Sequence, residues 1–78
     1  MIPVGFVLLA CMPEAEKAII ESVRSIPKVT YAYKVSGVYS IVIKVESESV
    51  EEFTLAIESI RKVPNILNTD TMIGFKKA

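Results

Sequence analysis

The chain of 78 residues contains no histidine and only one cysteine, Cys11. Without histidine, the usual zinc ligand sets and the bases that activate serine nucleophiles are missing. One cysteine excludes an intrachain disulfide, and we interpret Cys11 as a core residue because it ends an apolar run. The three glycines are isolated, so the sequence contains no phosphate-binding loop. We therefore expect no catalytic residue, no metal site and no cofactor.

No charge of one sign dominates, because nine Lys and Arg residues balance nine Asp and Glu residues. Binding to nucleic acid depends largely on clustered basic residues, so we expect no direct contact with nucleic acid. The apolar stretch from Val4 to Met12 is too short to span a bilayer and follows no basic segment. This argues against a membrane anchor and against a signal peptide. With the lone cysteine, these absences favour a cytoplasmic protein.

What the chain does contain is an internal repeat. Residues 20–29 (IESVRSIPKV) and residues 57–66 (IESIRKVPNI) share every apolar position, the Glu-Ser pair, the Arg and the Pro. The displacement is nearly half the chain length. Two copies are too few for a solenoid, so we interpret the chain as a duplicated supersecondary unit within one domain spanning residues 1–78.

Each half predicts a strand, a helix and a second strand. Apolar or alternating runs of strand length occur at residues 4–11, 29–35, 39–45 and 66–75. We expect the first helix to open at Pro13 and to end at Pro27. The second helix is expected to begin with a capping box, in which Ser49 and Glu52 satisfy backbone donors reciprocally, and to end at Pro64.

This order, βαββαβ, predicts an α+β fold of the ferredoxin-like type. Right-handed crossovers place the first and third strands at the centre of a four-stranded antiparallel sheet, with both helices on one face. The first strand is apolar on both sides: Phe6, Leu8 and Ala10 alternate with Val7, Leu9 and Cys11. An uncovered second face would leave a large apolar patch in water. We therefore expect a second copy to cover it by two-fold packing of sheets.

Polar residues gather at the turn before the third strand and in the last strand. From these residues alone, Ser36–Ser40 and Thr69–Thr71 are best interpreted as a turn and a polar edge strand. Residues 35–45 (VSGVYSIVIKV), however, resemble the signature hairpin of the effector-binding RAM domain of the Lrp/AsnC (feast/famine) regulators. In that family the hairpin reads approximately Val-Ser/Thr-Gly-Asp-Tyr-Asp before an apolar strand ending in Lys-Val. Residues 63–71 (VPNILNTDT) are similar to the family's Pro-Gly-Val and Thr-x-Thr strand, so the resemblance covers essentially the whole chain.

The resemblance implies a stand-alone RAM domain that lacks the helix-turn-helix of the longer regulators. It further implies sheet-packed dimers assembled into a ring, with an amino acid or similar small ligand bound between dimers. The residues to which this ligand-binding role carries over are Gly37, Tyr39, Ser40, Thr69 and Thr71. Val38 and Ser40 depart from the family's acidic positions, so Ser40 offers an α-ammonium group only a neutral hydrogen bond.

Three functions remain open on the sequence. The favoured hypothesis is a non-enzymatic oligomer that binds an amino acid and takes part in transcription regulation. A second is an interaction module that co-assembles with full-length Lrp/AsnC regulators. A third is a dimeric α/β-barrel enzyme, against which the absence of histidine and of a buried acid–base pair argues. An ACT-like amino-acid sensor shares the fold but fits the hairpin motif less well.

Overall fold

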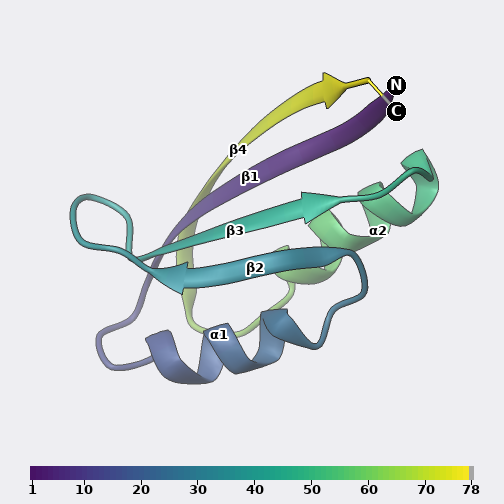
Figure 1. Ribbon diagram of the computed structural model, residues 1–78. Coiled ribbons are helices and arrows are strands. Elements are labelled where there is room, and N and C mark those ends of the chain that lie inside the picture. The colour runs from purple at the N-terminus through teal and green to yellow at the C-terminus, as the bar shows by residue number, and fades with distance from the viewer. Residues whose placement is uncertain (78) are drawn as a thin grey trace.

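The computed structural model describes residues 1–77, and its elements follow the order βαββαβ (Figure 1). The strands and helices are β1 (Ile2–Cys11), α1 (Glu16–Arg24), β2 (Val29–Lys34), β3 (Ile41–Glu46), α2 (Val50–Arg61) and β4 (Ile66–Lys76). The strands form one sheet in the order β2-β3-β1-β4, and each neighbouring pair is antiparallel. Both helices lie on the same side of the sheet (Figure 1). The predicted ferredoxin-like α+β fold is confirmed.

The core lies between the central strands and the helices. On β1 and β3, buried and half-buried residues alternate without interruption, as expected when one face of a strand meets the core. The helices contribute Ile19, Val23, Phe53, Ile57 and Ile60 to this core. The sheet contributes Val7, Leu9, Ala32, Ile41, Ile43 and Val45, each completely buried. Cys11 also belongs to the core, as the sequence predicted.

The two copies of the repeat end their helices in the same way. Lys28 and Asn65 each follow a proline directly, and their φ angles are 77° and 71°. The carbonyl of Lys28 accepts a hydrogen bond from the backbone N–H of Glu46, and that of Asn65 accepts one from Met12. A left-handed residue thus turns the chain from helix to strand in both halves, which explains why the duplicated segments include the turn.

The first helix begins later than the sequence predicted. Pro13 lies in a turn, Glu14 has a φ of 67°, and α1 starts at Glu16 with Ala15 as its N-cap. No side chain caps this helix. A left-handed Glu14 cannot continue a right-handed helix, so the proline marks the turn before the helix and not its first position.

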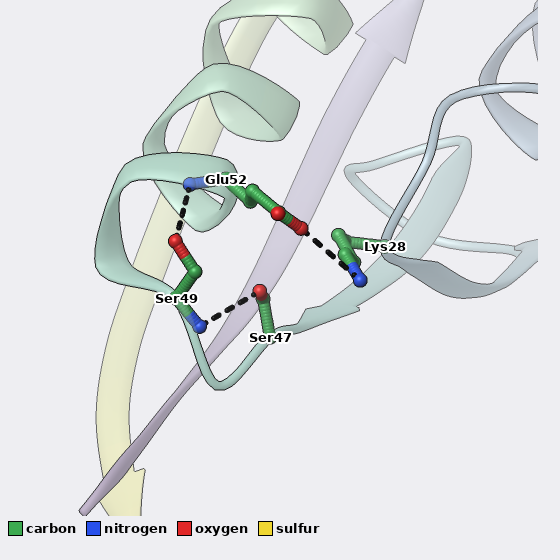
Figure 2. A network of polar contacts seen from close by, with 4 residues as sticks. All are labelled: Lys28, Ser47, Ser49 and Glu52. Atoms are coloured by element: carbon green, nitrogen blue, oxygen red, sulfur yellow. Dashed lines mark hydrogen bonds and ion pairs between the residues drawn. The ribbon is translucent and has the colours of Figure 1, made fainter.

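The second helix has half of the predicted capping box (Figure 2). The Ser49 hydroxyl accepts a hydrogen bond from the backbone N–H of Glu52 at 3.2 Å. The predicted reciprocal bond, from the Ser49 N–H to the Glu52 carboxylate, is wrong. The Ser49 N–H donates instead to the hydroxyl of buried Ser47 at 3.1 Å. The Glu52 carboxylate pairs with the Lys28 ammonium at 3.1 Å, which ties α2 to the turn before β2 (Figure 2).

The hairpin strands are shorter than expected, and a register shift at the start of β2 turns its first residue toward the helix side of the sheet. β2 ends at Lys34 and β3 begins at Ile41, whereas the sequence placed these ends at Val35 and Tyr39. The register with β3 shifts between Val29 and Tyr31. Val29 therefore packs against the core, whereas strict alternation along residues 29–35 would place it on the same face as Tyr31 and Tyr33. A bulge adds a residue without changing the sequence pattern, so alternation alone could not reveal it.

Within residues 1–77, neither helix has the length and apolar content needed to cross a bilayer.

Candidate functional site

The loop of the β2–β3 hairpin is anchored to the centre of the sheet. The Val35 N–H donates to the carbonyl of Ser40 at 2.9 Å, which closes the loop. The Ser40 N–H donates to the carbonyl of Leu9 at 2.8 Å, which attaches the loop to β1. Gly37, at the exposed tip, has a φ of +134°, and an added Cβ would meet no atom within 4 Å. The tip thus presents bare backbone to solvent, and its shape depends on a conformation that glycine adopts readily.

A contact between side chains joins this loop to the last strand. The Tyr39 hydroxyl donates to Oδ2 of Asp70 at 3.4 Å, across 31 positions of sequence. The pKa of Tyr39 is raised above its ordinary 10.0, first because its surroundings remove water from the phenol. The Asp70 charge and this hydrogen bond raise the pKa further, because a negative neighbour disfavours a phenolate. The 3.4 Å separation is long for a hydroxyl donor, so the contact is weak in the chain alone.

The register of the sheet shows which side of β4 each polar residue occupies. Asp70 lies opposite Leu8, which lies opposite Val42 on the other side. All three are on the face away from the helices, here called the open face. Thr69 and Thr71 lie opposite Leu9 and Val7, which are buried against the helices. Residues paired across antiparallel strands share a face, so both threonines point to the helix side.

The structure therefore brings together only part of the predicted ligand site. Gly37, Tyr39 and Ser40 lie in one loop. Thr71 is held on the far side of β4, where its hydroxyl accepts a hydrogen bond from the Arg61 guanidinium at 3.4 Å. Asp70, between the two threonines, is the residue of this strand that contacts the hairpin. The sequence contained no signal for Asp70 beyond its place inside the Thr-x-Thr segment.

The centre of the open face is apolar. From β1 it includes Val4, Phe6, Leu8 and Ala10, each half-buried by its neighbours on the sheet. Met72 and Tyr33 are both 54% exposed, and the rings of Tyr31 and Tyr33 stack with centroids 5.0 Å apart. The prediction that β1 is apolar on both faces is confirmed. A contiguous patch of this kind on an uncovered sheet is typical of an interaction surface.

One end of the open face is charged. The Glu46 carboxylate pairs with the ammonium groups of Lys76 at 2.8 Å and Lys44 at 3.7 Å. The hydrogen bond from Lys76 is the main cause that holds the pKa of Glu46 below its ordinary 4.5. The lysine charges add to this, while partial loss of water opposes it. The open face thus has an apolar centre, a charged group at one end and the Tyr39–Asp70 contact at the hairpin end.

Residues 5–78 match the family model of the Lrp/AsnC ligand binding domain. The chain belongs to this family. The match extends over nearly the whole sequence, and it confirms the resemblance first seen in the hairpin and in the last strand.

Solved structures of similar proteins agree with this Lrp/AsnC assignment. The PHS023 protein of Pyrococcus horikoshii, described as hypothetical, has 33% sequence identity and a TM-score of 0.86, with 99% of this chain and 93% of that chain covered. The TTHA0845 protein of Thermus thermophilus has 28% identity and a TM-score of 0.82, with 100% and 98% covered. Two solved chains of nearly this length therefore have the same fold over almost all of their residues. Among curated protein sequences, none matches this chain.

A longer regulator contains the same fold. AsnC of E. coli has 26% identity and a TM-score of 0.80, and 96% of this chain matches 52% of the AsnC chain. This Lrp/AsnC domain thus corresponds to about half of that regulator.

Proposed function

We propose that this Lrp/AsnC domain is a non-enzymatic regulatory oligomer that binds an amino acid. The observation that carries the proposal is the Tyr39–Asp70 contact, which joins the hairpin to β4 beside an uncovered apolar sheet face. A small-molecule site commonly combines apolar walls with a few convergent polar groups. The hairpin loop and β4 offer the polar groups, and a neighbouring subunit would complete the walls.

The proposed assembly is a dimer formed by packing two open faces together, with dimers then associating into a ring. Its support is the apolar centre formed by Phe6, Leu8 and their neighbours, which has no cover within residues 1–77. A chain of this size also buries a modest core, and self-association is one remedy for that. A two-fold contact is the simplest closed arrangement for one self-complementary face.

The proposed ligand site combines the hairpin with β4 across a subunit boundary. Gly37 and its neighbours offer backbone N–H groups to an α-carboxylate, and Tyr39 and Ser40 offer hydroxyls. Thr69 and Thr71 point to the helix side of the edge strand β4, so they would meet a ligand held against that edge by a neighbouring dimer. A structure related in fold, the transcriptional regulator NMB0573 of Neisseria meningitidis, is described as a complex with L-Met.

Two measurements on the purified protein test this proposal together. Light scattering after size-exclusion chromatography gives the mass of the assembly, and a thermal-shift screen compares the twenty amino acids. We expect a multiple of the chain mass, and one or more amino acids that raise Tm, because a ligand of the folded state stabilises it by mass action. A monomer at micromolar concentration contradicts the assembly, and a flat screen contradicts the ligand.

The assembly has its own variant. Leu8→Lys places an ammonium group at the centre of the open face, where a packed second copy would bury it without a partner. We expect a monomer. Thr54→Lys is the matched control, because Thr54 lies exposed on α2, away from the sheet. Equal masses for both variants and the parent would show that the open face is not the interface.

The second candidate is an interaction module for longer Lrp/AsnC regulators. It is favoured by the match to half of AsnC, which indicates that a similar open face exists in chains of that length. Co-expression with such a regulator would yield mixed oligomers that contain both chains, and Leu8→Lys would abolish them. We propose no direct contact with DNA or membrane for either function, and the cytoplasmic location remains a prediction.

A further inference from the structure

We infer that a groove between α2 and the turn after α1 binds a small uncharged molecule with an apolar body and a primary amide head. Pro27 and Lys28 form one side of this groove, and Leu55, Ala56 and Ser59 of α2 form the other. Its volume is about 620 Å³, within the usual range for small-molecule sites. None of these residues belongs to a strand, so the groove lies outside the open face. The site is independent of the function proposed above.

The internal repeat supplies an equivalent groove for comparison. It lies between α1 and the turn after α2, and its volume is about 100 Å³. The same displacement that relates residues 20–29 to residues 57–66 relates the two linings residue by residue. The corresponding pairs are Ala18 and Leu55, Ile19 and Ala56, Ser22 and Ser59, Val63 and Ile26, Pro64 and Pro27, and Asn65 and Lys28. The two halves thus share the backbone plan of the groove and differ in how far it is open.

Side-chain size explains the difference in volume. Ile19 is 2% exposed and fills the floor of the smaller groove, whereas Ala56, which is 3% exposed, leaves the corresponding space open. Leu55 is 62% exposed and forms a high rim, where the other half has Ala18. An apolar body that lies against Leu55 and Pro27 would remove their exposed surface from water, which favours binding.

The head of the ligand is indicated by the Lys28–Glu52 ion pair, which also lines the groove. The two side chains point toward each other from the turn and from α2 (Figure 2), and the other half has Asn65 and Ala15 at these positions. The Lys28 and Glu52 side chains remain 42% and 55% exposed, so both can accept a further partner. A primary amide presents an oxygen and an NH₂ group side by side, which match the ammonium and the carboxylate. A head with a single charge would be repelled by one member of the pair.

The test uses three probes of one shape that differ in the head: 4-methylpentanamide, 4-methylpentanoate and 4-methylpentylamine. Each is titrated into the full chain at neutral pH, and the backbone amide signals are followed by two-dimensional NMR. We expect the amide to bind with a millimolar Kd, as is usual for so small a molecule, and to shift the signals of Leu55, Ala56 and Ser59. The carboxylate and the amine should bind more weakly.

Three variants examine the body and the head separately. Leu55→Ala copies the rim of the smaller groove and should weaken binding of the amide roughly 3- to 10-fold, because part of the apolar contact is lost. Leu67→Ala makes the same change at a similarly exposed leucine of β4 and should leave the affinity unchanged. Lys28→Met keeps an unbranched side chain at the left-handed position and removes the ammonium. It should weaken binding of the amide and strengthen binding of the amine, because Glu52 then lacks its cation.

Four results would overturn the assignment. The groove is not the site if its signals stay unchanged, or if the amide shifts those of the hairpin instead. Equal affinity of Leu55→Ala and the parent contradicts the apolar contact. Equal affinity for the three heads contradicts the amide. A lower assembly mass of Leu55→Ala without any probe would show that the groove is a contact between copies. The amino-acid screen and the mass of the parent test the proposed function separately, so its failure is distinguishable from these results.

Discussion

Gly5 is predicted to be the least replaceable glycine in the chain, because β1 and α2 meet there without room for a methyl group. A Cβ added at Gly5 would lie 2.8 Å from Cζ of Phe53, 3.2 Å from Cε1 of the same ring and 3.5 Å from Cδ1 of Ile57. Phe53 is only 4% exposed, so its ring cannot move into solvent. Either the ring or the helix must shift.

We expect Gly5→Ala to lower the free energy of unfolding by about 1–3 kcal/mol, the usual cost of overpacking a core. In a domain of this size each kcal/mol corresponds to a fall in Tm of about 4–8 °C. Urea unfolding, followed by circular dichroism at one fixed protein concentration, measures the change. The concentration must be fixed because self-association makes apparent stability depend on it.

Two further variants test the reasoning behind this number. Phe53→Leu shortens the side chain that the new methyl would strike, so the double variant should lose less stability than the sum of the two single variants. A coupling of about 0.5–3 kcal/mol is typical of residues in contact. Gly74→Ala is the matched control, since a Cβ there meets no atom within 4 Å. If Gly5→Ala is as stable as Gly74→Ala, or if the coupling with Phe53 is zero, the close approach does not limit packing.

Two other predictions concern the turn after α2 and the charged end of the open face. Asn65→Gly should raise the free energy of unfolding by a few tenths to about 1 kcal/mol, because glycine adopts the φ of 71° readily. Asn65→Val should lower it by about 1–2 kcal/mol, because the same φ is strained for a β-branched residue. Urea unfolding of both variants checks that the glycine variant is the more stable of the two. The pKa of Glu46 is below 4.5 in the folded chain, so the stability that its pairing contributes is complete above pH 4.5 and is lost as the pH falls through the lowered pKa. Glu46→Gln should therefore lower the stability slightly above pH 4.5, where the pairing is complete, and flatten the acid side of the stability profile, and parallel profiles for the two proteins would contradict this.

Local patterns in the sequence were sufficient for the order of elements. The duplicated segments and the apolar periodicities predicted two similar halves, the four strands and a first strand that is apolar on both faces, all of which the structure confirms. These features depend on short-range rules, namely alternation in strands, spacing in helices and proline at helix ends. The resemblance in residues 35–45 added the family, which the family match confirms.

Local patterns failed where one residue changed the backbone path. The left-handed Glu14 delayed α1, and the register shift after Val29 turned that side chain toward the core. Both conformations leave the hydrophobic pattern almost unchanged, so sequence periodicity could not reveal them.

The partner of Asp70 was decided only by tertiary structure. Thr69, Asp70 and Thr71 are consecutive, but the pleat of β4 sends Asp70 to the open face and both threonines to the helix side. The sequence contained each residue of the candidate site, yet which face each one takes depends on register with β1, and the Tyr39–Asp70 contact spans 31 positions. Pairing at that distance is fixed by how the strands align, because a shift of one residue would exchange the two faces.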